Sequence, residues 1–412
     1  MTMSEWVEKR ICDITEIIAG GTPSTAVAEY WDGEISWITP NDLSNHKERY
    51  ILRGERNITK TGLNKSAAKL VPRNTLLLTT RAPIGYLAIA DKELSTNQGF
   101  KNLICNTKQV DYRFMYYYIT LNVEYFKAFA TGATFPELSS GTLKRIKVKV
   151  PPLPTQTRIA GILSAYDDAI ENNNRRIALL EKAARELYRE WFVRFRFPGH
   201  EKTRFVNGLP EGWEVVSFGS LANIIDGDRG INYPKQDEFS SDGYCLFLDA
   251  GNVTKDGFNF NNNSFITEDK DRILRKGRLI HNDIVLTTRG TVGNVAFYSK
   301  HIPYDVLRIN SGMIILRDSS EVPSVFLYLM LRSDYVKKMI ELYSSGSAQP
   351  QLPIKDMRKM KILKPTVFLL TKFSSIAADM LDQMALLQSQ SQSLTRQRDS
   401  LLPRLMSGKL EV

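Results

Sequence analysis

Two arginines stand at matching places in this chain, and each could bind an anion. Arg81 follows Thr80 in the run LLLTTRAPIG, and Arg289 follows Thr288 in IVLTTRGTVG. In both runs a glycine lies four residues after the arginine, within an otherwise apolar stretch. A guanidinium offers several N–H donors that suit a phosphate group or the edge of guanine. The repeated motif therefore predicts either a contact with nucleic acid or a brace for the strand that precedes it.

Further polar side chains follow each arginine. Amide groups of Asn and Gln can bind adenine through two hydrogen bonds, and Lys can bind phosphate. The later stretches TGATFPEL and SGSAQPQL add one polar residue in each half of the chain. The candidate DNA-binding residues are Thr80, Arg81, Asn97, Gln98, Lys101, Thr134, Thr288, Arg289, Asn310 and Gln349.

Catalytic patterns are weak by comparison. The four histidines lie far apart, the three cysteines form no CxxC pair, and GGTPST lacks the spacing of a phosphate-binding loop. Asp256 and the run Glu268, Asp269, Lys270 could form a nuclease-like group, but the first half of the chain has no equivalent. We therefore expect no catalytic residue, no metal site and no cofactor bound by this chain.

Composition agrees with a binding role. Lys and Arg number 55 against 45 Asp and Glu, so the net charge is +10, which attracts anionic polymers such as nucleic acid. Hydrophobic residues make up 42% and charged residues 24%, as in ordinary folded proteins. No run suggests a membrane span or a signal peptide, and the scattered cysteines suit a reducing compartment. These features predict a cytoplasmic protein.

The two arginine motifs belong to a longer internal repeat. Trp6, Gly20, Asn97 and Pro136 reappear in order as Trp213, Gly227, Asn310 and Pro350, with an offset that grows from 207 to 214 residues. Chance matches would scatter their offsets, so we interpret the pattern as a duplication with small insertions.

Each copy reads as short apolar strands separated by turn residues. The strands are ISWI, TLLLTT, YLAIA and FKNLI in the first copy and CLFLD, DIVLTT, NVAFY and MIILR in the second. A helix-like stretch follows in each, at residues 112–129 and 323–343. The order predicts an α+β fold with two duplicated domains on curved β-sheets.

Each copy ends in a long helical pattern. From Ile159 to Trp191 the apolar positions are spaced four and three residues apart throughout, and adding 214 yields a second seam from Phe373 to Leu405. A sustained heptad period indicates two helices packed as an antiparallel coiled coil, each about 39 residues and about 58 Å long. Asn173 in the first seam either fixes the register or lies at a solvated edge. The predicted division is a first domain at 1–150, a central helix at 151–197, a second domain at 198–365 and a C-terminal helix at 366–412.

With these motifs in order across the whole chain, the sequence resembles the specificity subunit of a Type I restriction-modification system. The stretch PPLPTQTRIAGILSAYDDAIENNNRRIALLEKAARELYREWF carries the resemblance most specifically. It implies two target recognition domains that each read one half of a split, asymmetric DNA site, while the helices set the unread spacer. It also implies two modification subunits that carry S-adenosylmethionine and adenine methylation, and two restriction subunits that carry ATP-driven translocation and cleavage, with Mg. The second helix lacks the glutamine of PTQTRIA, so the sequence leaves open whether both helices dock their modification subunits equally.

Residues that read bases should differ between copies that read different sequences. The unmatched stretches Asn41 to Asn64 and Asp226 to Asn263 are therefore the expected readers. Two alternatives stay open from the sequence: a stand-alone DNA-binding regulator or scaffold that bridges two DNA sites, and an enzyme with an unrecognised site.

Overall fold

The computed structural model describes residues 6–44, 46–132, 134, 136–346 and 349–412. The chain divides into two compact units, and both boundaries fall inside the long helices. Unit 1 comprises Met1–Glu171 and Gln392–Val412, and unit 2 comprises Asn172–Ser391. Each unit therefore holds one copy of the repeat and a part of each long helix. None of the helices in the described residues combines the length and the hydropathy that a membrane span requires.

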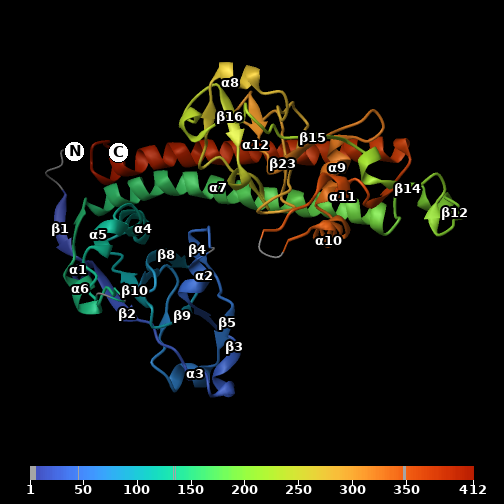
Figure 1. The fold of residues 1–412 in the computed structure, drawn as a ribbon. Helices are drawn as coiled ribbons and strands as arrows, with labels where there is room; N and C mark the ends of the chain where they lie inside the picture. Colours follow the sequence, from blue (N-terminus) through green and yellow to red (C-terminus); the bar gives the residue numbers. More distant parts are fainter. Residues whose placement is uncertain (1–5, 45, 133, 135, 347–348) are drawn as a thin grey trace. The chain divides into compact units, whose positions relative to one another are not determined.

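Unit 1 contains two main sheets (Figure 1). The larger runs in the order β2-β10-β7-β8-β4, and the smaller in the order β5-β3-β9-β6. A third pair joins β1 to β11 in antiparallel register, so the two ends of the domain meet. The strands are β1 (Val7–Arg10), β2 (Thr15–Ala19), β3 (Trp31–Ile38), β4 (Tyr50–Ile51), β5 (Arg56–Ile58), β6 (Leu70–Val71), β7 (Leu76–Thr80), β8 (Ile84–Ala90), β9 (Leu94–Thr96), β10 (Phe100–Cys105) and β11 (Lys147–Val150).

Unit 2 repeats this topology. Its sheets run β15-β23-β20-β21 and β19-β16-β22, and β14 pairs with β24 as β1 pairs with β11. A parallel contact in the smaller sheet also recurs, since β3 lies parallel to β9 and β16 lies parallel to β22. The strands are β14 (Glu214–Ser217), β15 (Asn223–Asp226), β16 (Cys245–Leu248), β19 (Phe265–Ile266), β20 (Ile284–Thr287), β21 (Val295–Phe297), β22 (Leu307–Ile309), β23 (Met313–Arg317) and β24 (Lys361–Lys364). The topology confirms the duplication.

The strand before each arginine is apolar at successive positions because both of its faces are covered. On β7, Leu76 and Leu78 join the core beneath the domain's helices, whereas Leu77 points into a second core with Phe100. On β20, Ile284 and Leu286 face one core and Val285 faces the other. A strand buried on both sides gains from apolar residues at every position, which explains the run LLL.

The helix predicted after each sheet is broken into two. In the first copy, α4 (Tyr112–Leu121) ends at Asn122, whose side chain donates to the Tyr118 carbonyl, and α5 (Val123–Lys127) follows. In the second copy, α9 (Ser324–Leu331) and α10 (Asp334–Tyr343) are separated by a turn in which the Ser333 hydroxyl caps the new helix. Helix over both predicted stretches is therefore confirmed, with one short break in each where a side chain satisfies the freed backbone groups.

The heptad seam is confirmed along both long helices, α7 (Leu153–Tyr188, extended by a π-helical turn at Arg189–Val193) and α12 (Val367–Met406). All twenty predicted seam positions are buried or half-buried. Asn173 is 8% exposed, so it lies within the seam and not at a solvated edge.

The helices pair antiparallel within each unit. In unit 1, Ile159 and Leu163 near the start of α7 share a core with Leu402 and Leu405 near the end of α12. In unit 2, Trp191 at the end of the first helix packs on Phe373 near the start of α12, with ring centroids 5.7 Å apart. The start of one helix thus meets the end of the other in both cases.

A buried charge network joins the first domain to both helices in unit 1. Asp167 of α7 is 5% exposed, forms an ion pair with Arg398 of α12, and accepts a hydrogen bond from the Tyr117 hydroxyl. Burial, followed by the neighbouring Asp167 carboxylate, raises the pKa of Tyr117, so the phenol stays protonated as a donor. Arg49, just before β4, completes the network through Glu171 at 2.9 Å and through Asp168.

We expect Asp167→Ala to lower the free energy of unfolding by about 2–3 kcal/mol, because it removes the acceptor of the buried Tyr117 hydroxyl and one partner each of Arg49 and Arg398. Glu190→Ala is the matched control, since it breaks an exposed pair with Arg194 and should cost under about 1 kcal/mol. Urea unfolding followed by circular dichroism measures both. Equal losses would show that the network adds nothing beyond a surface pair.

Candidate nucleic-acid interface

The Thr-Thr-Arg motif lies at the end of an interior strand of each larger sheet, β7 in unit 1 and β20 in unit 2. The Thr80 hydroxyl donates to the Gly99 carbonyl at 3.3 Å, and the Thr288 hydroxyl donates to the Gly312 carbonyl at 3.0 Å. Both threonines are buried, and their backbone carbonyls accept from Leu138 and Leu352 at 2.9 Å. These internal contacts hold the strand end in place. The two threonines are therefore structural residues and are not among the proposed DNA contacts.

The two asparagines brace the turn beside each motif. The Asn97 carboxamide oxygen accepts from the Gly99 N–H at 2.9 Å, and Asn310 accepts from the Gly312 N–H at 2.8 Å. An Asx turn of this kind locks the backbone of a short loop. Both asparagines are half-buried, which leaves their amide nitrogens as the groups that could face a ligand.

The repeated glycines explain why this turn can form. A Cβ on Gly20 would lie 1.9 Å from the Asn97 carbonyl oxygen, and a Cβ on Gly227 would lie 2.2 Å from that of Asn310. Only glycine permits so close a backbone approach. The glycine four residues after each arginine is also required, because Gly85 and Gly293 have φ values of 103° and 93°.

Arg81 and Arg289 stand where the strand meets a closed loop. Arg81 forms an isolated bridge with Glu137, and Arg289 forms one with Gln351. Two backbone hydrogen bonds close each loop, between Thr131 and Glu137 in the first copy and between Ser345 and Gln351 in the second. Arg81 is half-buried and Arg289 is exposed. Neither guanidinium has a hydrogen-bond or ion-pair partner within the described ranges, so both are available to an outside anion.

The remaining candidates differ in their availability. Lys101 is 8% exposed and faces Glu137 at 3.7 Å, which makes it an internal partner in the first domain. Gln98 is exposed and accepts a hydrogen bond from the Thr22 hydroxyl. Thr134 and Gln349 are exposed on the two closed loops. The surface set is therefore Arg81, Arg289, Asn97, Asn310, Gln98, Thr134 and Gln349.

Gln156, the residue that the second helix lacks, also has an internal role. Its amide donates to the Gln109 and Pro151 carbonyls at 3.1 and 2.8 Å and accepts from the Asp111 N–H at 3.0 Å. Leu370 takes the corresponding place in α12 and is fully buried. At this position the two helices therefore differ in internal packing.

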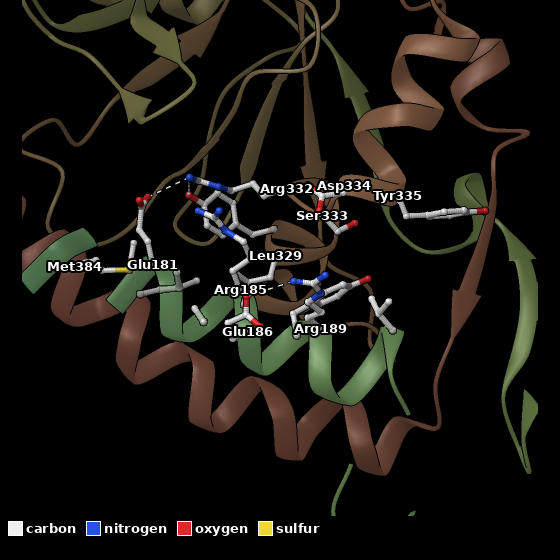
Figure 2. A pocket seen from close by; sticks show the side chains of 15 residues that line it. Glu181, Arg185, Glu186, Arg189, Leu329, Arg332, Ser333, Asp334, Tyr335 and Met384 are labelled. Atoms are coloured by element: carbon white, nitrogen blue, oxygen red, sulfur yellow. Dashed lines mark hydrogen bonds and ion pairs between the residues drawn. The ribbon is translucent and has the colours of Figure 1, made fainter. Parts of the chain in front are cut away.

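A partly open cavity of about 180 Å³ lies in unit 2 between α7, α9 and α12. Figure 2 shows its charged side chains turned toward one another, with Arg332 pointing to Glu181 and Arg189 lying beside Glu186. Burial raises the pKa of the Tyr328 hydroxyl, which lies 2.5 Å from Arg332. Arg332 is paired with Glu181 and Tyr328, and Arg189 is paired with Glu186, so these side chains brace the helices that line the cavity.

The nuclease-like group suggested by the sequence is dispersed. Lys270 forms an ion pair with Glu238 at 2.8 Å, and Glu268 pairs with Arg272 at 2.7 Å on the short helix α8 (Glu268–Ile273). Across the part of the chain that the structure describes, no group of three His, Cys, Asp or Glu side chains is placed to hold a metal ion.

A doubled α+β domain, with each copy followed by one long helix, defines the class of protein. The family model described as Type I restriction modification DNA specificity domain matches residues 3–182 and again 210–367. The specificity subunit of the Type I restriction enzyme MjaIX from Methanocaldococcus jannaschii is 34% identical over 99% of this chain and 94% of its own length. That of HindI from Haemophilus influenzae is 23% identical over 99% of this chain and its full length.

A solved structure shares the fold. The crystal structure of the S subunit from M. genitalium superposes with a TM-score of 0.68 at 20% identity, covering 97% of this chain and 96% of that one. This chain belongs to the family of Type I restriction-modification specificity subunits.

Gly227→Ala should lower the free energy of unfolding by at least about 2 kcal/mol, because the new methyl group would overlap the Asn310 carbonyl. Gly161→Ala, on the surface of α7 with open space around its Cα, should be neutral or should stabilise the chain by up to about 1 kcal/mol. Thermal unfolding of both variants distinguishes the two sites. A tolerated Gly227→Ala would show that the turn is not held by close backbone contact.

Proposed function

We propose that this chain recognises a bipartite, asymmetric DNA site, with each duplicated domain binding one half, and directs the adenine methylation and restriction that partner subunits perform. One observation carries the proposal: the two copies keep the same strand-end framework but place different side chains around it. A fixed scaffold with variable surface residues is what the reading of two different sequences requires.

The framework residues occupy equivalent roles in both copies. Thr80 and Thr288 hold the strand, Asn97 and Asn310 hold the turn, and a glycine packs against each turn. By contrast, the exposed loop residues change, with Thr134 in one copy and Gln349 in the other. The unpartnered Arg81 and Arg289 suit phosphate, which positions the protein without specifying sequence. The surrounding stretches 41–64 and 226–263 are the proposed base readers.

Catalysis is assigned to partners in this proposal. Two modification subunits would carry S-adenosylmethionine, and two restriction subunits would carry ATP and Mg, with no cofactor and no catalytic residue on this chain. The duplication supports two equal docking surfaces. Ile162 on α7 and Ile376 on α12 occupy equivalent positions of the repeat, 214 residues apart. They are 37% and 39% exposed. An exposed isoleucine at the same place on both helices suits a repeated protein contact.

Exchanging residues 1–150 for the corresponding region of a relative should change one half of the methylated sequence and leave the other half intact, because each copy has its own sheets and loops. The measurement is methylome sequencing of cells that carry the hybrid chain with its modification subunit. A change in both halves would refute the assignment of one half-site to each domain.

Arg289→Ala should weaken DNA binding by the full chain without changing its melting temperature, because the guanidinium makes no internal contact within the described residues. If Arg289 contacts one phosphate, the slope of log K against log salt concentration should fall by about one. Arg204→Ala is the control, since it removes an equal exposed charge from unit 2 beside β12 (Phe205–Val206). A lowered melting temperature with unchanged DNA affinity would make Arg289 a brace.

A further inference from the structure

A short basic loop in unit 2 is exposed, but side chains from two other segments bind its backbone. Residues 274–278, with the sequence LRKGR, follow α8 and lead toward β20. Arg275, Lys276 and Arg278 are exposed, whereas Leu274 is buried. Figure 1 places α8 beside β16, on the part of unit 2 that carries the smaller sheet.

A buried arginine clamps the loop from below. Arg308 on β22 is 4% exposed, and its guanidinium donates to the backbone carbonyls of Lys276 at 2.6 Å and Leu274 at 3.0 Å. Its charge is balanced by Asp271, which is 1% exposed and lies 2.5 Å from the Arg308 Nε. Burying a charged pair is costly unless its hydrogen bonds are filled, and here the loop backbone fills them.

A carboxylate clamps the loop from the other side. Asp228 accepts from the backbone N–H groups of Arg275 at 2.6 Å and Lys276 at 3.3 Å. Burial by itself would raise the pKa of Asp228, but these N–H donors outweigh it and the pKa is lowered, so the carboxylate stays charged. Gly277, with φ at 82°, closes the turn against Ile309, where a Cβ would lie 3.1 Å from the Ile309 Cγ1.

The two side chains that this clamp presents are not neutralised. Arg278 pairs with Asp271 at 3.2 Å, and Arg272 pairs with Glu268. Arg275 and Lys276 have no ion-pair or hydrogen-bond partner for their side chains in the described part of the protein. The fold thus fixes the backbone that carries the unpaired Arg275 and Lys276 side chains. An anion that binds them does not have to order the loop, so binding avoids that entropy cost.

The loop is continuous with the candidate interface. Asp228 follows Gly227, which packs directly against the Asn310 carbonyl. On its other side, Arg229 donates to the Ser311 carbonyl at 3.2 Å. Arg289 adjoins the same turn, since its backbone N–H donates to the Gly312 carbonyl at 3.1 Å. A chain of direct contacts therefore connects Arg289, through the Asn310 turn, to Arg275 and Lys276.

The first domain builds the same junction without a charged residue at the aligned positions, and its nearest exposed cations, Lys65 and Lys69, lie to either side of them. The repeat offsets place Gly21 opposite Asp228 and the pair Ala67–Ala68 opposite Arg275–Lys276. A Cβ on Gly21 would lie 2.2 Å from the Ala67 carbonyl carbon and 2.4 Å from the Ala68 nitrogen, so the two backbones touch directly. Ser95 occupies the place of Arg308, and Thr22 occupies that of Arg229. In the second copy this direct backbone contact is replaced by the charged side chains of Asp228 and Arg308, which bind the backbone of the loop that carries Arg275 and Lys276.

We propose that Arg275 and Lys276 form a preformed loop that binds phosphate groups of the DNA backbone in the second domain only, so the two half-sites contribute unequally to salt-dependent binding. The inference rests on the proposed function and deepens it. Duplex phosphate is the ligand that suits two adjacent exposed cations continuous with a DNA-reading surface.

The test is the salt dependence of binding by the full chain to a fluorescent mixed-sequence DNA duplex, between 50 mM and 200 mM salt. The double variant Arg275→Ala/Lys276→Ala should lower the slope of log K against log salt concentration by about 1.8, because each lost phosphate contact removes about 0.9. Its melting temperature should not change, since Asp228 and Arg308 bind the backbone of Leu274, Arg275 and Lys276 and not the side chains that are replaced. The charge-keeping variant Arg275→Lys/Lys276→Arg should restore the slope.

Lys202→Ala/Arg204→Ala is the matched control, because it removes two exposed charges beside β12, which Figure 1 shows well away from α8 in unit 2. Its slope should fall by much less than that of the loop variant. Equal slopes for the loop variant and the unmodified chain would overturn the inference while leaving the proposed function in place. If the unmodified chain has no affinity for duplex DNA, the proposed function itself fails.

Discussion

The close backbone contact between a glycine and an asparagine carbonyl, made once in each copy, is the constraint on which the rest of the structure depends. Gly20 and Gly227 bring the strand that begins each larger sheet against the turn formed by Asn97 or Asn310. A glycine carbonyl of this turn accepts a hydrogen bond from the hydroxyl of the threonine that precedes each arginine. Because these contacts are short and directional, the strand end, the turn and the arginine are held in one geometry in both copies.

This geometry separates framework from surface. Thr80, Thr288 and Lys101 are polar but buried, and each finds an internal partner, as buried polar groups must. Around them, Arg81 and Arg289 and the two closed loops face outward. Duplication preserves the framework because a lost internal hydrogen bond destabilises the domain. Surface residues are free to diverge, as the replacement of Ala67–Ala68 by Arg275–Lys276 shows.

The two long helices diverge by the same logic. Asp167 and Arg398 form a buried ion pair in unit 1, whereas the repeat offset of 214 puts Leu381 and Ala184 at the equivalent seam positions of unit 2. There the contact is apolar and is continued by Trp191, Phe192 and Phe373. Neither helix could replace the other without burying an unpaired charge, so the two halves of the seam are chemically distinct although their spacing is the same.

The sequence by itself determined the duplication, the strands and the two helices, because these depend on local spacing. Short stretches of sequence are enough to recognise a heptad period, an apolar run or a glycine at a tight turn. The seam from Ile159 to Trp191 and Gly85 are examples. It also pointed to Arg81 and Arg289, since their repetition is visible in the letters. It indicated helix over residues 112–129 and 323–343 but did not place the short breaks, where the side chains of Asn122 and Ser333 cap the backbone locally.

Only the tertiary structure decided which polar residues face inward. Gln156 and Lys101 looked like contact residues, but their partners come from distant parts of the chain: Gln109 and Asp111 for the first, Glu137 for the second. The basic loop was likewise hidden, because its clamps, Asp228 and Arg308, lie more than thirty residues away along the chain. Burial and pairing are properties of what packs against a side chain, and that information is spread over the whole fold.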